Sequence, residues 1–152
     1  EPFIRMAAGF GEASIKHDKE RYEHKYEYCD LLITGSGPSG LASAYAAAKN
    51  GARVILAEDK PRFGGSLLTS DVNIGNQTGV EWTEKIIAEL KSMPNVTVKN
   101  RSQVFGYYDH NMLVMSERIS DHLPKTQKYL KNHIQESYRV LVLYWLCFLN
   151  YK

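Results

Sequence analysis

Residues 29–58 read CDLLITGSGPSGLASAYAAAKNGARVILAE, and this stretch sets the architecture of the chain. A short apolar run at residues 31–34 leads directly into three glycines, Gly35, Gly37 and Gly40, spaced as GxGxxG. An alanine-rich stretch of helical length follows, and a second apolar run at residues 53–57 ends on Glu58. Strand, glycine turn, helix, strand and acid in this order are typical of a βαβ unit that binds a dinucleotide.

Each glycine of this fingerprint has a distinct physical role. Gly35 permits the tight turn, Gly37 lets a pyrophosphate approach the backbone, and Gly40 allows the helix to pack closely on the strands. The positive end of the helix favours a phosphate at this turn. We therefore expect the whole turn to bind the cofactor, through Gly35, Ser36, Gly37, Pro38, Ser39 and Gly40.

Glu58 and the loop after it extend the predicted site. A carboxylate at the end of the second strand accepts hydrogen bonds from a ribose diol. The next residues read DKPRFGGS, and an acid followed shortly by a Gly-Gly pair is common in flavoproteins with two dinucleotide-binding domains. An ordinary loop is the alternative interpretation. The predicted contacts of this segment are Glu58, Asp59, Lys60, Gly64, Gly65 and Ser66.

Composition excludes several other classes of function. The 152 residues fit about one domain, and the formal charge of +2 is spread along the chain without a basic cluster, so no nucleic-acid partner is expected. Cys29 and Cys147 lie far apart and the five histidines are scattered, so neither a metal site nor a redox dithiol is indicated. Reduced thiols favour a cytoplasmic protein. The apolar run at residues 139–149 is too short for an ordinary membrane span, so no membrane partner is expected.

The remaining segments predict further elements. Residues 16–27 are rich in charge and tyrosine and indicate a solvated helix or a linker, while residues 70–78 are rich in turn formers. Thr78 and Glu81 fit a capping box, which predicts a helix to about Ser92, where Pro94 enforces the end. Residues 95–99 alternate as a strand, which we expect beside the first strand, placing the first strand centrally. Residues 103–118 predict a hairpin that turns at residues 109–111.

Several local strings carry a resemblance to a known family. They are EPFIRMAAG at residues 1–9, RYEH at residues 21–24, GGSL at residues 64–67 and GYYD at residues 106–109, in addition to the glycine fingerprint. Over residues 1–130 the chain resembles the alpha subunit of heterotetrameric sarcosine oxidase. The resemblance implies an α/β, Rossmann-like FAD/NAD(P)-binding three-layer fold with a central parallel sheet, here apparently truncated. It also implies that residues 1–28 link to an upstream domain, residues 29–130 form a partial dinucleotide-binding domain, and residues 131–152 form an atypical apolar tail.

The resemblance further implies a reaction and its cofactors. The family oxidatively demethylates sarcosine to glycine and hydrogen peroxide, passing the one-carbon unit to tetrahydrofolate or releasing it as formaldehyde. Its alpha subunit holds NAD, its beta subunit holds FAD, FMN lies between the two, and gamma and delta subunits complete the complex. In this chain the three turn glycines would hold the pyrophosphate and Glu58 the adenosine ribose. The backbone of Val104 would lie near adenine. No catalytic residue is assigned, and the fragment alone is expected to be inactive.

Cofactor identity and function class stay open at the level of sequence. The Glu58 carboxylate would repel a 2′-phosphate, so NAD ranks first, FAD second and NADP third. One alternative is a stand-alone nucleotide-binding module without catalysis. Another alternative is a small FAD- or NAD-dependent flavoprotein reductase. The absence of a C-x-x-C motif from the sequence argues against it.

Overall fold

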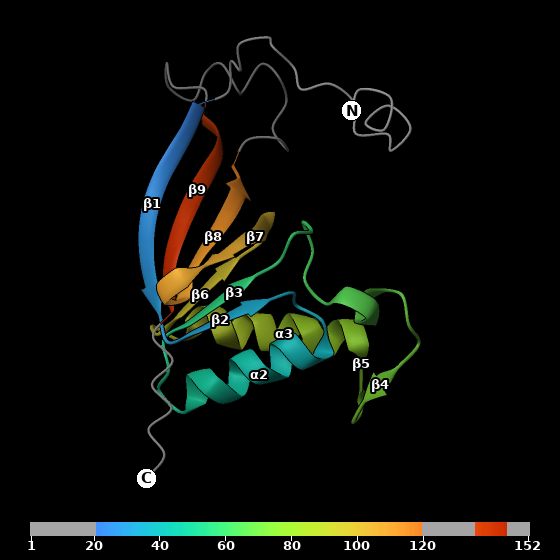
Figure 1. The fold of residues 1–152 in the computed structure, drawn as a ribbon. Coiled ribbons are helices and arrows are strands. Elements are labelled where there is room, and N and C mark those ends of the chain that lie inside the picture. Colours follow the sequence, from blue (N-terminus) through green and yellow to red (C-terminus); the bar gives the residue numbers. More distant parts are fainter. Residues whose placement is uncertain (1–20, 120–135, 146–152) are drawn as a thin grey trace, which may run out of the picture.

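A computed structural model describes residues 21–119 and 136–145 of the chain (Figure 1). The strands are β1 (Arg21–Cys29), β2 (Leu31–Thr34), β3 (Val54–Ala57), β4 (Asn73–Ile74), β5 (Gln77–Thr78), β6 (Val96–Lys99), β7 (Ser102–Tyr108), β8 (Met112–Arg118) and β9 (Glu136–Trp145). The α-helices are α2 (Pro38–Lys49) and α3 (Gly79–Ser92), and the short 3-10 turns are η1 (Gly65–Leu68) and η2 (Asp109–Asn111).

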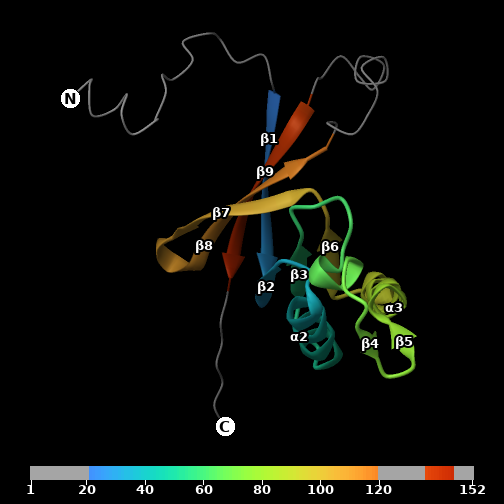
Figure 2. The ribbon, with the colours of Figure 1, turned by 90° about the vertical axis from the view of Figure 1, so that its right-hand side faces the viewer.

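The βαβ unit forms as its sequence predicts. β2, β3 and β6 make a parallel sheet in the order β2-β3-β6, with α2 connecting the first pair and α3 the second. Figures 1 and 2 show both helices on one side of this sheet. Two expectations are wrong: β6 pairs with β3 rather than with β2, and β3 rather than β2 is the central strand.

Burial explains why β3 is central. All four residues of β3 are buried, whereas no residue of β2 is fully buried. Val54 and Leu56 face the helices, in a core with residues of α2 and α3, and Ile55 and Ala57 face the opposite side. A strand that is covered on both faces reads as a continuous apolar run. VILA meets this requirement, whereas LLIT ends on the exposed Thr34.

A second sheet covers the other face of the parallel sheet. Its order is β1-β9-β8-β7, in which β1 and β9 run parallel and the other neighbours run antiparallel. Cys29 and Met115 of this sheet pack against Ile55 and Ala57. The molecule therefore has three layers, helices, parallel sheet and mixed sheet (Figure 2), and the predicted α/β three-layer class is confirmed.

Other predicted segments differ in detail. Residues 21–29 form strand β1 rather than a helix or linker, because they pair along their length with β9. The turn-rich loop at residues 70–78 contains the two-residue strands β4 and β5. The hairpin of β7 and β8 is confirmed, with His110 and Asn111 at positive φ in its turn. Part of the apolar run forms β9, while residues 1–20, 120–135 and 146–152 lie outside the described residues. The domain boundaries stay predictions.

Local signals fix both helices. Pro38 occupies the first turn of α2, and Asn50 ends the helix with its backbone N–H and its side chain on carbonyls of the last turn. The capping box of α3 is complete, since Thr78 Oγ1 accepts from the Glu81 N–H and Glu81 accepts from the Thr78 N–H at 2.8 Å. α3 ends at Ser92, just ahead of Pro94, as expected.

Candidate dinucleotide site

The structure brings the two glycine segments into direct contact. The Gly64 N–H donates to the backbone oxygen and to Oγ of Ser36, both at 3.1 Å. A Cβ on Gly65 would lie 3.0 Å from Cα of Gly37. Gly64 and Gly65 have φ angles of 123° and 53°, in the region that favours glycine. The second glycine pair is thus needed both for its backbone conformation and for close packing on the first turn.

The turn before α2 has the properties of an anion site. Gly37 is the N-cap, the helix start has no side-chain cap, and its first turn holds no acidic residue. A Cβ added at Gly37 would meet nothing within 4 Å, so open space lies beside the N-terminal N–H groups. Unpaired N–H groups and the helix dipole favour a phosphate here. The residues present therefore fit a pyrophosphate.

Glu58 follows β3 and lies beside this turn. Only 6% of its surface is exposed. Its Oε2 accepts from the N–H of Ser36 at 2.8 Å and from Oγ of Ser36 at 2.5 Å, and its Oε1 accepts from the N–H of Lys60 at 3.0 Å. A buried carboxylate needs hydrogen-bond donors for its oxygens. Glu58 is therefore held at the site by the backbone on both sides of it.

Asp59 and Lys60 occupy the exposed rim of the site. Their side chains form an ion pair of 3.2 Å. The pKa of the Asp59 carboxyl is lowered, first by its hydrogen bond with the Glu58 side chain and then by Lys60. Arg118 of β8 donates to the Asp59 backbone oxygen, which ties this rim to the mixed sheet. Both side chains are exposed to solvent, Lys60 more than Asp59.

Val104 lies apart from the glycine segments in its side-chain packing. It is on β7, and its side chain packs with Cys29, Ile55 and Ala57 between the two sheets. No described contact joins it to the turn at Gly37. The placement of its backbone near adenine stays a prediction, as do the ligand contacts of every other predicted site residue.

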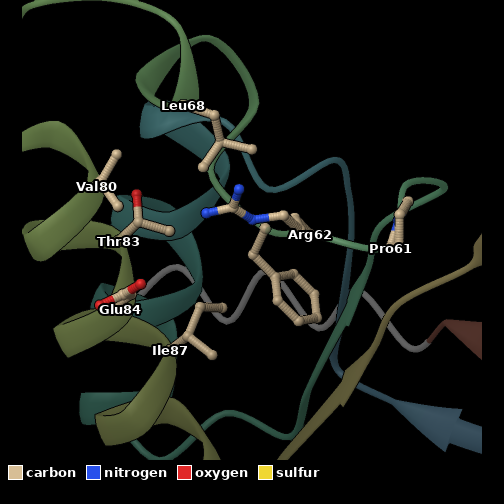
Figure 3. Close-up of a pocket in the computed structure, with 8 residues that line it drawn as sticks. Pro61, Arg62, Leu68, Val80, Thr83, Glu84 and Ile87 are labelled. Carbon is tan, nitrogen blue, oxygen red and sulfur yellow. The ribbon is translucent and has the colours of Figure 1, made fainter.

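Two hollows lie near these segments. The first, of about 550 Å³, follows β2 and the start of α2 and is lined by Leu31, Leu32, Ile33, Thr34, Gly35, Gly37, Ser39, Gly40 and Ser43. Ser43 is absent from the predicted site, although its spacing of four residues from Ser39 places it one helical turn along the same face. The second, of about 220 Å³, lies against α3, where Arg62 extends toward Thr83 (Figure 3). It shares no lining residue with the first.

In residues 21–119 and 136–145 no group of three or more His, Cys, Asp or Glu side chains is placed to hold a metal ion. Neither α2 nor α3, nor any shorter helix of the described segments, has the length and apolar character that crossing a membrane requires.

Several known proteins are similar to this chain in sequence. Residues 30–92 match a family model described as FAD dependent oxidoreductase. Sarcosine oxidase subunit alpha of Rhizobium meliloti (strain 1021) is 42% identical over 130 residues, which are 86% of this chain. This chain is related to sarcosine oxidase alpha subunits. The corresponding subunit of Corynebacterium sp. (strain U-96) is 34% identical over 119 residues, or 78% of this chain.

The relatives are much longer than this chain. The matched region covers 13% of the Rhizobium meliloti subunit and 12% of the Corynebacterium subunit. Among solved structures, L-proline dehydrogenase from P. horikoshii is similar with a TM-score of 0.55 and 15% identity, covering 86% of this chain and 23% of that one. At that identity the similarity concerns the fold alone, which it supports.

Proposed function

We propose that residues 35–66 bind the adenosine diphosphate part of a dinucleotide cofactor. One observation carries the proposal: the turn at Gly37, the pair at Gly64 and Gly65, and the buried Glu58 converge on one place, linked by hydrogen bonds through Ser36. A purely structural glycine turn needs no open space beside Gly37 and no buried acid next to it. A dinucleotide needs both.

Different residues of the proposed site would bind different parts of the cofactor. The helix N-terminus at Gly37 supplies N–H groups and a positive potential for the pyrophosphate. Glu58 supplies a carboxylate that accepts from a ribose hydroxyl and repels a 2′-phosphate. The adenosine diphosphate part is common to NAD and FAD. The matched family model supports FAD, and NAD rests on the family resemblance, so the choice between them belongs to the experiment below.

The intact protein is proposed to be an amine oxidoreductase of the sarcosine oxidase type. The identity to sarcosine oxidase alpha subunits across most of this chain supports an oxidoreductase that acts on an amine donor. By the family resemblance, the intact complex would oxidatively demethylate sarcosine to glycine. It would contain beta, gamma and delta subunits and would use FMN and tetrahydrofolate. No side chain among the described residues is assigned a role in the chemical step itself.

A ligand-dependent thermal melt tests the proposed site. NAD, FAD and NADP are titrated separately into the wild-type chain and into Gly37→Ala, whose added Cβ lies in open space. A ligand that binds only the folded state at a hundred times its Kd adds about 2.7 kcal/mol to the free energy of unfolding.

The melt has three outcomes. A shift with NAD or FAD that Gly37→Ala removes supports the site and selects the cofactor. Stabilisation by FAD alone would point toward a flavoprotein. A cooperative melt that none of the three nucleotides shifts contradicts the proposal.

A further inference from the structure

Ser36 connects every part of the proposed dinucleotide site without reaching solvent. Its exposed surface is 0%, so it offers no surface to a ligand in this structure. Its N–H and its hydroxyl both donate to Oε2 of Glu58, at 2.8 and 2.5 Å. Its Oγ and its backbone oxygen both accept from the Gly64 N–H. One side chain therefore bridges the first turn, the acid and the second glycine pair.

Counting hydrogen-bonding positions on Glu58 gives a functional consequence. A carboxylate has about four accepting positions, two on each oxygen. Ser36 takes both positions on Oε2, and the Lys60 N–H takes one on Oε1. With both positions on Oε2 taken, Oε1 is the oxygen through which a ligand hydroxyl can reach Glu58. Glu58 therefore faces a ribose through Oε1 alone, beside the hydrogen bond that its side chain makes with Asp59.

We propose that Ser36 is a positioning residue, which orients Glu58 so that Oε1 accepts from a ribose hydroxyl and which holds the second glycine pair against the first turn. This inference rests on the proposed dinucleotide site and deepens it. In the absence of the Ser36 hydroxyl, Oε2 loses one of its two donors, and only the Ser36 and Lys60 N–H groups still orient the carboxylate. The Gly64 N–H keeps only the backbone oxygen as its acceptor.

The test measures affinity for two probes that differ only in the ribose. ADP and 2′,3′-dideoxy-ADP are titrated calorimetrically into wild type, Ser36→Ala, Glu58→Gln and the double variant. We expect Ser36→Ala to weaken ADP about tenfold, the order of one lost hydrogen bond to a charged group. The dideoxy probe lacks both hydroxyls, so Ser36→Ala should weaken its affinity less than about threefold. That change is smaller than the effect of losing one such hydrogen bond. In the Glu58→Gln background, Ser36→Ala should have little further effect on ADP.

A matched control separates positioning from general stability. Ser92→Ala removes an exposed hydroxyl at the end of α3, which donates to the Glu89 backbone oxygen, and should leave both affinities unchanged. A merely structural role for Ser36 would weaken both probes equally and would add to the effect of Glu58→Gln. That result overturns the inference.

A ligand-free measurement distinguishes failure of the inference from failure of the site. Amide hydrogen exchange at Gly64 should be faster in Ser36→Ala than in wild type, while exchange at Gly51 stays the same. If wild type binds neither probe, the proposed function fails, and the Gly64 exchange rate still decides whether Ser36 joins the two glycine segments. An unchanged rate at Gly64 contradicts that part of the inference.

Discussion

Gly40 is the residue of the first turn at which a side chain has no room. A Cβ there would lie 2.2 Å from the Gly35 backbone oxygen. Helix propensity alone would favour alanine at this position by about 1 kcal/mol. We expect the clash to reverse this, so that Gly40→Ala lowers the free energy of unfolding by about 3 kcal/mol or more.

Denaturant unfolding measures the Gly40 effect, with Gly37→Ala as the matched control. The control adds the same methyl group three residues earlier, into open space, and should cost no more than about 1 kcal/mol, from weaker capping. Equal losses at the two positions would show that the turn relaxes around Gly40.

The stability of the chain is expected to depend on pH through Asp30, at the start of the βαβ unit. Its Oδ2 accepts from the N–H of Arg53 at 2.8 Å, and its Oδ1 accepts from the Arg53 guanidinium at 2.7 Å. These bonds lower the pKa of Asp30 from 3.8 to about 2. Because the folded pKa is depressed, this contribution is present above about pH 4 and is lost as the pH falls through 2.

Thermal melts between pH 5 and pH 2 test the Asp30 contribution. Asp30→Asn should melt below wild type at pH 5, and the difference should shrink toward pH 2. The exposed Asp71→Asn serves as the control and should show no such trend. A gap between Asp30→Asn and wild type that is constant with pH would refute the assignment.

At the residue scale, the sequence predicts which residues belong to the site better than it predicts which residues they contact. The three glycines, Glu58 and the Gly-Gly pair are recognisable from spacing alone. The bonds of Ser36 are not, because they join residues 22 and 28 positions apart and depend on how the two loops fold together. A serine between two glycines has no sequence feature that distinguishes a buried bridge from an exposed ligand contact.

At the scale of elements, the capping box fixes where α3 begins. Thr78 Oγ1 accepts from the Glu81 N–H, and the Glu81 carboxylate accepts from the N–H and hydroxyl of Thr78. Thr78→Ala removes one side of this exchange and should cost about 1 kcal/mol of unfolding free energy. Urea unfolding of Thr78→Ala, Glu81→Gln and the double variant measures the coupling; strictly additive effects would mean that the two residues act separately.

Elements that depend on local signals are predictable from the sequence, and those that depend on distant pairing are not. α2, α3 and the β7–β8 hairpin follow from caps, periodicity and a turn that are read within 20 residues. In residues 21–29 aromatic and charged side chains alternate at strand spacing, but the density of charge favoured a solvated segment. The partner strand β9 begins more than 100 residues later, so no local signal indicates the pairing. The position of β6 does not follow from the sequence, because the crossover from β3 can return either to the free edge of β3 or to the far side of β2.

At the scale of the whole molecule, Lys99 ties the layers together. Its Nζ lies 3.3 Å from Glu27 of β1 and 3.5 Å from Glu117 of β8, and only 10% of its side chain is exposed. Lys99→Met would leave two carboxylates near each other without this cation. We expect a loss of about 1–3 kcal/mol, less than for a fully buried pair because both carboxylates keep some solvent contact.

Chemical unfolding of Lys99→Met, alone and combined with Glu27→Gln and Glu117→Gln, measures this cross-layer contribution. Neutralising the two acids should recover part of the stability lost with the lysine. No recovery would mean that the lysine stabilises the layers by packing of its aliphatic chain rather than by charge.

Amide hydrogen exchange with and without bound nucleotide is the most direct test of the proposed dinucleotide site. Saturating NAD or FAD should slow exchange together at residues 35–41 and at residues 64–66, since one ligand would cover both glycine segments. Protection confined to residues 80–87, beside the second hollow at Arg62, or no protection at all, would contradict the site.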